Sequence, residues 1–441
     1  MRPRAYRRRR GRVKESAVPS AGLRRWGWRE VKDEPGRPFR SRVAVQRCED
    51  YEPERVKEAV RAAVALCLEG RSLELGEGSV LVKPNVLAPR PPEDGVCTHP
   101  AVVSAVLAVL REAGATELVV GDSSGGTGVR PDVTDRSLEA SGIAEAAAAA
   151  GARVVAFDRE EPVLVPNPRG PGEAPLALSR VAVEAGCLVS LPKLKTHTLT
   201  LLTGAVKNLF GTVPGGAKRE YHRRNPSVES FSNLLLDIVE LLKPVLHVVD
   251  AVEAMQGSGP SAGSVRRVGL IVAGTDPVAV DAVLAAVMGV GPAEVPTTRL
   301  GAARGLGEAD LDRIEVVGVP LSEARVPGFR LPPGTRLISR LPPGLTRWAV
   351  SLATTRPAFI AGRCTGCGQC VKNCPVDALR LTGGVPELSS EKCIGCFCCH
   401  ELCPSQAVSI RYRHPLTNLL LRPDRGAPFR STGTGRRRHR T

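Results

Sequence analysis

The chain has 441 residues, enough for two or three domains with a large buried core. Its net charge of +16 is concentrated at the ends, because residues 1–40 carry fourteen Lys and Arg against four acidic residues, and residues 411–441 carry nine Arg against one. No apolar run approaches the roughly 18 residues that span a bilayer, and the Arg-rich start lacks the apolar core of an export signal. These features argue against a membrane span and against export, and the cysteine motifs described below predict a reducing cytoplasm.

The two tails, residues 1–40 and 412–441, lack apolar periodicity and are predicted to be disordered, solvated extensions. Runs of Arg can also bind the phosphates of nucleic acids through counterion release. We favour the solvated extensions, because no folded nucleic-acid module accompanies the tails. Nucleic acid stays open as a partner that only the tails would bind.

Short apolar strands alternate with segments of helical periodicity between the tails. We expect strands at 42–46, 79–85, 116–122, 152–158, 187–191, 245–250, 268–273 and 314–317, and helices at 54–68, 98–113, 137–150, 228–242 and 277–288. The alternation predicts an α/β domain over residues 41–318, with a mostly parallel sheet and helices on both faces. Residues 319–357 are Pro-rich and are predicted to be a linker that packs along this body.

Polar motifs follow four of the predicted strands. They are Lys83-Pro-Asn85, Asp122-Ser123, Lys193-x-Lys195-x-His197 and Asp250. Ligands bind at the carboxyl ends of strands in such sheets, so the coincidence predicts a site there.

Lysines supply the predicted charge of this site. Lys193 and Lys195 alternate along an extended segment and point to one side, and with Lys83 and Lys207 they would hold a carboxylate or a phosphate. The alternative is an ordinary solvated basic edge. The other candidate substrate contacts are Asn85, Ser123 and Asp250.

Proton transfer at this site is assigned to His197 or Asp122, since histidine titrates near neutral pH. A further divalent metal is a weaker hypothesis, because no ligand spacing unites the available side chains: His99, His197, His222, His247, Asp122, Asp250 and Glu253. His247 lies within an apolar strand and is expected to be structural.

Two glycine-rich segments leave their interpretation open. Gly121–Gly128 follows a strand and would form either an anion-binding nest or a tight turn, and it lacks the spacing of a Walker or Rossmann loop. Asp250 and Glu253 precede a Gly-rich loop, which would either position a substrate or be a capped loop with a structural role only.

The most specific motif lies near the end of the chain. Cys364-x2-Cys367-x2-Cys370-x3-Cys374-Pro375 is repeated as Cys393-x2-Cys396-x2-Cys399-x3-Cys403-Pro404. Each run has the bacterial spacing for a [4Fe–4S] cluster, in which the fourth Cys ligates the other cluster. We therefore assign one cluster to Cys364, Cys367, Cys370 and Cys403, and the second to Cys393, Cys396, Cys399 and Cys374.

Zinc is the alternative metal for these cysteines, but zinc sites usually join two separate Cys-x2-Cys pairs and lack the third Cys and the Cys-Pro. Cys398 is an extra thiol, expected to be a packed bystander. The repeated runs resemble the two-cluster bacterial ferredoxin domain, a small α+β fold, over residues 358–411.

The larger domain resembles the family catalogued as domain of unknown function 362, over roughly residues 42–318. The motifs that carry the resemblance are Lys83-Pro-Asn85, Thr98-His-Pro100, Gly121-Asp-Ser123, Pro192-Lys-Leu-Lys-Thr-His197, Gly204-Ala-Val-Lys-Asn-Leu-Phe-Gly211 and the segment from Asp250 to Gly263. The resemblance implies a fold and a role beside iron–sulfur clusters, and it implies no agreed reaction.

The sequence thus predicts an iron–sulfur protein with two [4Fe–4S] clusters. The clusters would pass electrons between a reductant and an anionic substrate or a redox partner protein at the α/β domain. Such a chain would be an iron–sulfur oxidoreductase. Two alternatives stay open: a non-enzymatic electron carrier or adaptor, and a nucleic-acid-associated redox protein that uses its basic tails.

Overall fold

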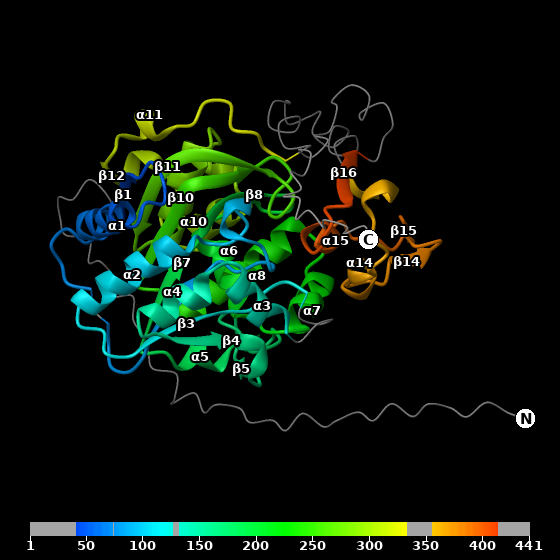
Figure 1. The fold of residues 1–441 in the computed structure, drawn as a ribbon, viewed down its shortest axis with the longest axis horizontal. Coiled ribbons are helices and arrows are strands. Elements are labelled where there is room, and N and C mark those ends of the chain that lie inside the picture. The colour runs from blue at the N-terminus through cyan, green and yellow to red at the C-terminus, as the bar shows by residue number, and fades with distance from the viewer. Residues whose placement is uncertain (1–40, 74, 127–131, 333–354, 413–441) are drawn as a thin grey trace, which may run out of the picture.

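The computed structural model describes residues 41–73, 75–126, 132–332 and 355–412. They form a large α/β body and, beside it, a small cysteine-rich domain of residues 355–412 (Figure 1). Both basic tails lie outside the described residues except for Tyr412, which ends β16, so the predictions of disorder and of nucleic-acid binding stay predictions. The same holds for residues 333–354 of the expected linker.

The body is built on one ten-stranded sheet. Eight strands follow one another across it in the order β12 (Ile314–Gly318), β1 (Ser41–Arg47), β11 (Ser264–Gly274), β10 (Leu246–Gln256), β7 (Cys187–Leu191), β2 (Val80–Pro84), β3 (Leu118–Asp122) and β4 (Arg153–Ala156). The other two are β8 (Lys193–His197), which pairs with β10, and β9 (Leu201–Thr203), which pairs with β8. Most pairs are parallel, whereas β11 runs antiparallel to both β1 and β10.

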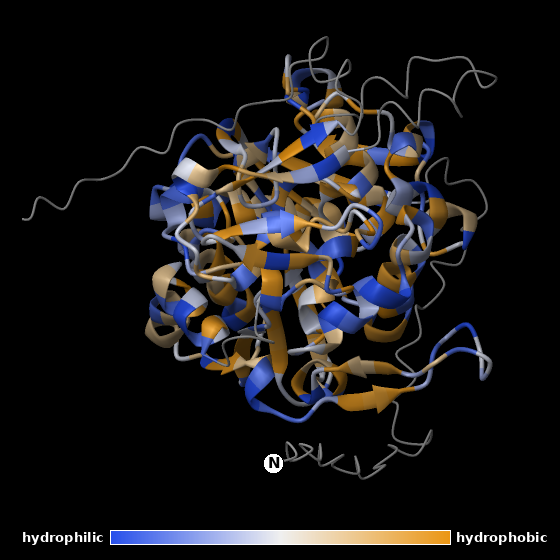
Figure 2. Cartoon of the chain, turned by 90° about the vertical axis from the view of Figure 1, so that its right-hand side faces the viewer, coloured by the Kyte–Doolittle hydropathy of each residue, from blue (hydrophilic) through white to orange (hydrophobic). Residues whose placement is uncertain are grey.

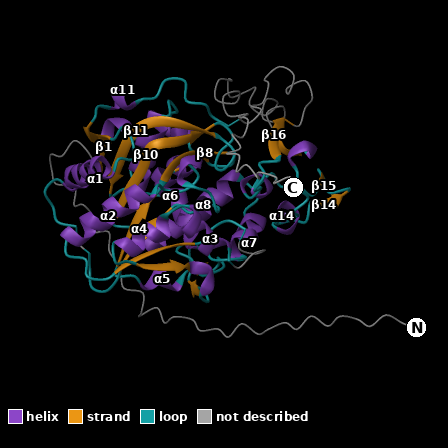
Figure 3. Cartoon of the chain, viewed as in Figure 1, coloured by secondary structure: helices purple, strands orange, loops and turns teal. Residues whose placement is uncertain are grey.

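Helices cover both faces of this sheet (Figure 3), as predicted. One face packs against α1 (Pro53–Leu68), α2 (Pro100–Glu112) and α4 (Ile143–Ala149). The other packs against α8 (Val228–Leu242) and α9 (Pro277–Val287). Alternation along a strand divides its side chains between the faces: Val80 and Val82 join the first core and Leu81 the second. The central strands are accordingly apolar along most of their length (Figure 2).

Three expected elements differ in length. The single helix predicted at 137–150 is two helices, α3 (Val133–Ala140) and α4, because Gly142 takes a left-handed φ of 71° between them. The strands expected at 245–250 and 268–273 extend into an eleven-residue antiparallel pair, β10 and β11. Glu253 therefore lies on β10, beyond an irregularity after Ala251, and the Gly-rich loop follows this strand.

Several short elements were not expected from periodicity. They are β5 (Val163–Val165), β6 (Leu176–Leu178), α5 (Arg180–Glu184), α6 (Ala205–Asn208), α7 (Ala217–Arg224), α10 (Pro296–Ala303) and α11 (Leu321–Ala324). Elements of three to eight residues are too short to show a full helical or strand period. The described part of the expected linker, 319–332, packs on the body, where Phe329 is buried and Arg330 O accepts a bond from Gly257 N (2.7 Å).

The cysteine-rich domain consists of two short antiparallel pairs and two single-turn helices. Its elements are β13 (Thr355–Phe359), α14 (Gln369–Lys372), β14 (Leu379–Thr382), β15 (Val385–Leu388), α15 (Cys398–Glu401) and β16 (Val408–Tyr412). β13 pairs with β16 and β14 with β15. Within the described ranges of the whole chain, no helix has both the length and the apolar character needed to cross a membrane.

Candidate functional site: two cysteine sets beside an interdomain cavity

One of the two predicted cysteine sets is grouped around a small hollow. Cys364, Cys367 and Cys370 line it together with Cys403, which comes from the other run. Cys374 packs in the same small core as Cys393 and Cys399, to which Cys370 and Cys403 also belong. The first set is the one expected for a cluster that borrows a ligand from the other run; the assignment of individual ligands stays a prediction.

The backbone around both sets is duplicated. Gly366 and Gly395 have left-handed φ angles of 67° and 68°, and the next pair of equivalent positions, Gly368 and Phe397, have 70° and 59°. Left-handed residues tighten the loop so that successive cysteines turn toward one centre. Phe397 adopts this conformation without being glycine.

The chemistry of the donor sets suits an iron–sulfur cluster. Burial, followed by the charges of Cys396 and Cys393, raises the pKa of Cys399 well above its ordinary value, so these thiols resist joint ionisation unless a cation neutralises them. Backbone N–H groups already point at two sulfurs, from Ala378 to Cys374 Sγ and from Ala407 to Cys403 Sγ, both at 3.2 Å. Hydrogen bonds of this kind tune cluster potentials.

The thiols are not gathered as ligands of a single ion. In the part of the chain that the structure describes, no three His, Cys, Asp or Glu side chains converge closely enough to hold one metal ion. Tetrahedral zinc would need four thiolates about 2.3 Å from one point. The separate metal site considered for the α/β domain likewise finds no such convergence among its described candidates.

A cavity of about 290 Å³ lies between the body and the cysteine-rich domain. The body contributes the ends of β2 and β3, helix α6 and helix α7, and the small domain contributes α14 and α15. The polar lining residues are Asn85, Asp122, Ser123, Thr203, Lys207, Asn208, Lys218, Arg219, His222, Lys372, Asn373, Cys398 and Glu401. The predicted strand-end site is thus completed by the domain that carries the cysteines.

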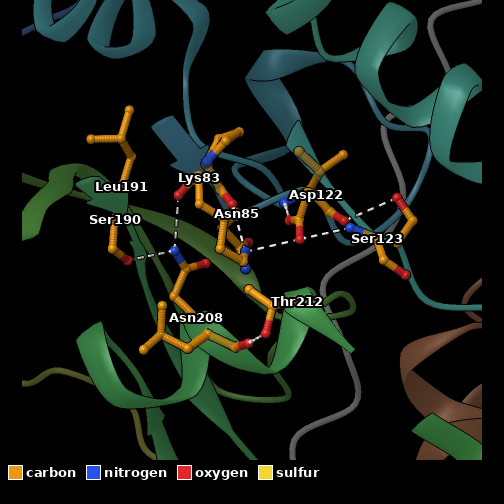
Figure 4. Close-up of polar contacts among 12 residues, drawn as sticks. Lys83, Asn85, Asp122, Ser123, Ser190, Leu191, Asn208 and Thr212 are labelled. Atoms are coloured by element: carbon orange, nitrogen blue, oxygen red, sulfur yellow. Dashed lines mark hydrogen bonds and ion pairs between the residues drawn. The ribbon is translucent and has the colours of Figure 1, made fainter. Parts of the chain in front are cut away.

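Lys83 and Asp122 form a buried ion pair at 2.8 Å between the ends of β2 and β3 (Figure 4). Burial lowers the pKa of Lys83 and raises that of Asp122, and the pairing opposes both shifts. Asp122 also accepts from Val86 N, and Gly211 lies so close that a Cβ there would be 2.0 Å from Asp122 Oδ1. Only Asp122 of this pair lines the cavity.

Lys193 and Lys195 are also internal, each about 1% exposed, so neither a solvated edge nor an open cationic strip forms. Lys193 pairs with Asp250 at 2.9 Å, and both contact the hydroxyl of Tyr51. Lys195 donates to Asn85 Oδ1 at 2.7 Å, and burial lowers its pKa to about 7. Lys193 and Lys195 support the site without lining the cavity. Among the two lysines and their side-chain partners named here, only Asn85 lines it.

His197 joins the two domains. Its Nδ1 accepts from the N–H groups of Leu199 and Thr200, so its proton resides on Nε2, 2.9 Å from Glu401 Oε1. Burial lowers the pKa of His197 to about 4, which keeps the imidazole neutral. The N–H of His197 is therefore on the nitrogen nearest Glu401, although this contact lacks hydrogen-bond geometry, and His197 does not line the cavity. The proton-transfer role predicted for it stays a prediction.

Lys207 is the predicted lysine that does line the cavity, at the end of α6. Burial lowers its pKa, while the neighbouring Glu401 and Cys398 raise it. Its ammonium lies 5.8 Å from the ring centre of Phe210.

Nine polar lining residues were not among the predicted site residues, and Lys218, His222, Cys398 and Glu401 are four of them. Lys218 and His222 sit on α7, a short helix without a periodic signature, and α15 carries the other two. Cys398 occupies the position equivalent to Gln369 in the first run. That extra thiol between two cluster cysteines was the one available signal.

The anion nest considered for the turn after β3 is not formed by its described part. Ser123 N donates to Gly211 O and Asp122 Oδ1, Ser124 N to Thr134 Oγ1, and Gly125 N to Leu87 O. These N–H groups are engaged within the protein, so the turn is structural through Gly125. The turn also brings Gly125 against Leu402 of the cysteine-rich domain.

Comparisons with known proteins agree with this two-part organisation. Residues 80–286 match the family described as Domain of unknown function (DUF362), and residues 356–404 match the 4Fe-4S dicluster domain. The Thylakoid-associated protein sll1697 of Synechocystis sp. is 33% identical over 226 residues, which are 49% of this chain and 65% of that protein. The chain thus spans just under two thirds of this relative.

Two solved structures show weaker similarity. The lactate racemase apoprotein of Thermoanaerobacterium thermosaccharolyticum is 12% identical, with a TM-score of 0.35 over 54% of this chain and 55% of its own. A protein from Thermotoga maritima is 15% identical, with a TM-score of 0.33 over 52% and 57% of the two chains.

Proposed function

Because the chain carries a DUF362 domain followed by a 4Fe-4S dicluster domain, we propose that it is an oxidoreductase that delivers electrons to a small anionic molecule in the interdomain cavity. When bound, the two clusters supply one-electron transfer. An external reductant is oxidised and the molecule in the cavity is reduced. The observation that carries the proposal is the lining of this cavity by Cys398 and Glu401, which flank the cluster cysteine Cys399, together with Lys207 and Lys218 of the body.

Different residues would bind the substrate, exchange protons with it and support the site. Lys207 would bind the negative charge of the substrate and oppose the charge gained on reduction. His222, which burial holds neutral by lowering its pKa to about 4, and the buried Asp122 are the nearest groups for proton exchange. Lys83, Lys193 and Lys195 would hold the substrate-binding framework in place rather than touch the substrate.

The proposed compartment is the cytoplasm, because all thirteen cysteines are free in the structure and eight of them belong to the cluster motifs. An electron carrier or adaptor without a bound substrate is the competing function. It predicts reversible reduction of the clusters by a partner protein and no saturable reaction with a small molecule.

The test is the reoxidation of anaerobically reduced, cluster-loaded full-length protein by small anionic acceptors, nitrite and fumarate, in a stopped-flow spectrometer. We expect the rate with at least one of them to saturate with its concentration. We expect Lys207→Met to lower the apparent second-order rate constant for that acceptor about tenfold, a loss equivalent to roughly 1.4 kcal/mol. Lys392→Met, which removes an exposed lysine beside Cys393 and outside the cavity, is the matched control.

Reoxidation that stays linear in acceptor concentration and is equal in wild type, Lys207→Met and Lys392→Met would favour the carrier function instead.

A further inference from the structure

Besides Glu401 Oε1, which lies 2.9 Å from His197 Nε2, three further buried polar atoms of the cavity lining have no hydrogen-bond partner among the described residues. They are Thr203 Oγ1, Asn208 Oδ1 and His222 Nδ1, on side chains that are 3%, 2% and 6% exposed. A buried polar atom left unsatisfied costs about 1–3 kcal/mol, so native proteins rarely leave several together. The grouping of all three around one cavity indicates that its occupant satisfies them.

Asn208 defines part of the occupant's chemistry. Its Nδ2 donates to Lys83 O (3.2 Å) and to Ser190 Oγ (2.9 Å), which Figure 4 shows. A backbone carbonyl only accepts, so the amide cannot be turned over, and Oδ1 is left as the free end. Oδ1 is an acceptor only. The occupant must therefore bring a hydrogen-bond donor.

Lys207 defines the other part. The three N–H groups of Lys218 are engaged by Ser123 O, Ser123 Oγ and Ser124 O, and Arg219 pairs with Asp377. The ammonium of Lys207, by contrast, has no hydrogen bond within the described part of the chain, although it lies between the domains. Its N–H groups are therefore available for an anionic group.

The two carboxylates at the cavity do not compete for this role. Asp122 is held by Lys83, Val86 N and Ser123 N. Glu401 is 2.9 Å from the Nε2–H of His197. Neither carboxylate hydrogen-bonds to Lys207, and Glu401 attracts its ammonium only electrostatically, so the N–H groups of Lys207 stay available to an anion.

We propose that the cavity binds a small oxyanion that also carries a hydrogen-bond donor, with its anionic oxygen on Lys207 and its hydroxyl or amino group on Asn208 Oδ1. His222 Nδ1 and Thr203 Oγ1 complete its hydrogen bonds. The volume of about 290 Å³ is at the lower end for small-molecule sites, which favours a compact metabolite. This inference rests on the proposed function and names the substrate class of the same site.

The test is isothermal titration calorimetry on the oxidised, cluster-loaded full-length protein with four probes. Glycolate has the charge and the donor, acetate only the charge, and glycolamide only donors and no charge. Inorganic phosphate also combines charge and donor and separates a phosphate ligand from a carboxylate. We expect glycolate or phosphate to bind at least tenfold more tightly than both acetate and glycolamide.

Two variants locate this binding. Lys207→Met should reduce the affinity for the charged probe at least tenfold and leave glycolamide unchanged. Thr203→Val removes a hydroxyl that has no partner in the described residues, and it should weaken the preferred probe severalfold. Thr298→Val is the matched control, because Thr298 Oγ1 is equally buried and unpartnered within the described residues but lies on α10, outside the cavity.

Acetate binding as tightly as both glycolate and phosphate, an unchanged affinity in Lys207→Met, or no heat with any of the four probes would each overturn this inference. The calorimetry involves no electron transfer, so its failure can be told apart from that of the proposed function. If the protein binds the preferred probe selectively but its reoxidation does not depend on the acceptor, only the oxidoreductase proposal is contradicted.

Discussion

Buried histidines illustrate what single residues contribute to this protein. His247 lies fully inside β10, and neither ring nitrogen has a hydrogen-bond partner among the described residues. Burial lowers its pKa from 6.5 to about 3. The folded state therefore holds it neutral while the unfolded state protonates below pH 6.5. Its folded pKa is depressed, so folding is favoured above pH 6.5 and loses stability as the pH falls from there toward 3.

His247→Met should raise the free energy of unfolding at pH 7 by about 1 kcal/mol, because two unsatisfied polar atoms leave the core. Its advantage over wild type should grow by about 1.4 kcal/mol per pH unit between pH 6.5 and pH 4, since the variant has no group to protonate. Anaerobic urea unfolding of both proteins at pH 7.5, 6 and 5 measures this. An advantage that is the same at all three pH values would contradict the explanation.

The lysines at the strand ends act at the scale of elements. Lys83 and Asp122 tie β2 to β3, and Lys193 and Asp250 tie β8 to β10, in both cases through buried pairs at 2.8–2.9 Å. Removal of one partner of a buried pair leaves an uncompensated charge in a low-dielectric environment. The pairs therefore fix how the strand ends are spaced, and with them the wall of the cavity.

Lys83→Met should destabilise the protein by about 3–5 kcal/mol at pH 7, because Asp122 would be left buried without its cation. The loss should shrink in mild acid, where the carboxyl group of Asp122 becomes neutral; its pKa is already raised by burial. Arg61→Met is the control: Arg61 pairs α1 with Glu112 of α2, both side chains are about half exposed, and such pairs contribute roughly 0–1 kcal/mol. Equal losses in the two variants, measured by urea unfolding, would argue against a structural role for the buried pair.

The whole molecule depends on how the cysteine-rich domain docks on the body. Arg90 donates to Pro404 O (2.8 Å), Arg219 pairs with Asp377 (2.7 Å), and the imidazole of His197 meets Glu401. Glu401 thus carries a buried negative charge two residues from Cys399 and Cys403, at the edge of the cavity. Burial would raise its pKa, but His197 and Lys207 outweigh that effect and lower it, so the carboxylate is ionised.

Glu401→Gln should raise the midpoint potential of one cluster by on the order of 60 mV, because a nearby negative charge opposes the addition of an electron. Redox titration followed by electron paramagnetic resonance separates the two clusters. Glu387→Gln, an exposed substitution on β15 of the same domain, should leave both potentials nearly unchanged. Potentials of both clusters that stay unchanged in Glu401→Gln would contradict this electrostatic explanation.

Local sequence patterns predicted much of the architecture. The apolar strands and the long helices α1, α2, α8 and α9 appear near the expected residues, because periodicity and capping act within a few turns of chain. The cysteine runs are equally local, and their spacing alone indicated two clusters. Polar residues at the ends of β2 and β3 were also predicted correctly to lie at one edge of the sheet, where Asn85, Asp122 and Ser123 all line the cavity.

Only the tertiary structure decided which charges are available and which domain completes the site. The sequence presents Lys193, Lys195 and Lys207 alike, but Tyr51 and Asp250 engage the first, 142 and 57 residues away, and Asn85 the second, 110 residues away. Glu401, on the other domain, meets His197 from 204 positions further along the chain. Partners so distant in sequence leave no periodic trace. Desolvation and ion pairing depend on which residues folding brings together. Lys193 and Lys195 are engaged by such distant partners, whereas Lys207 lines the cavity.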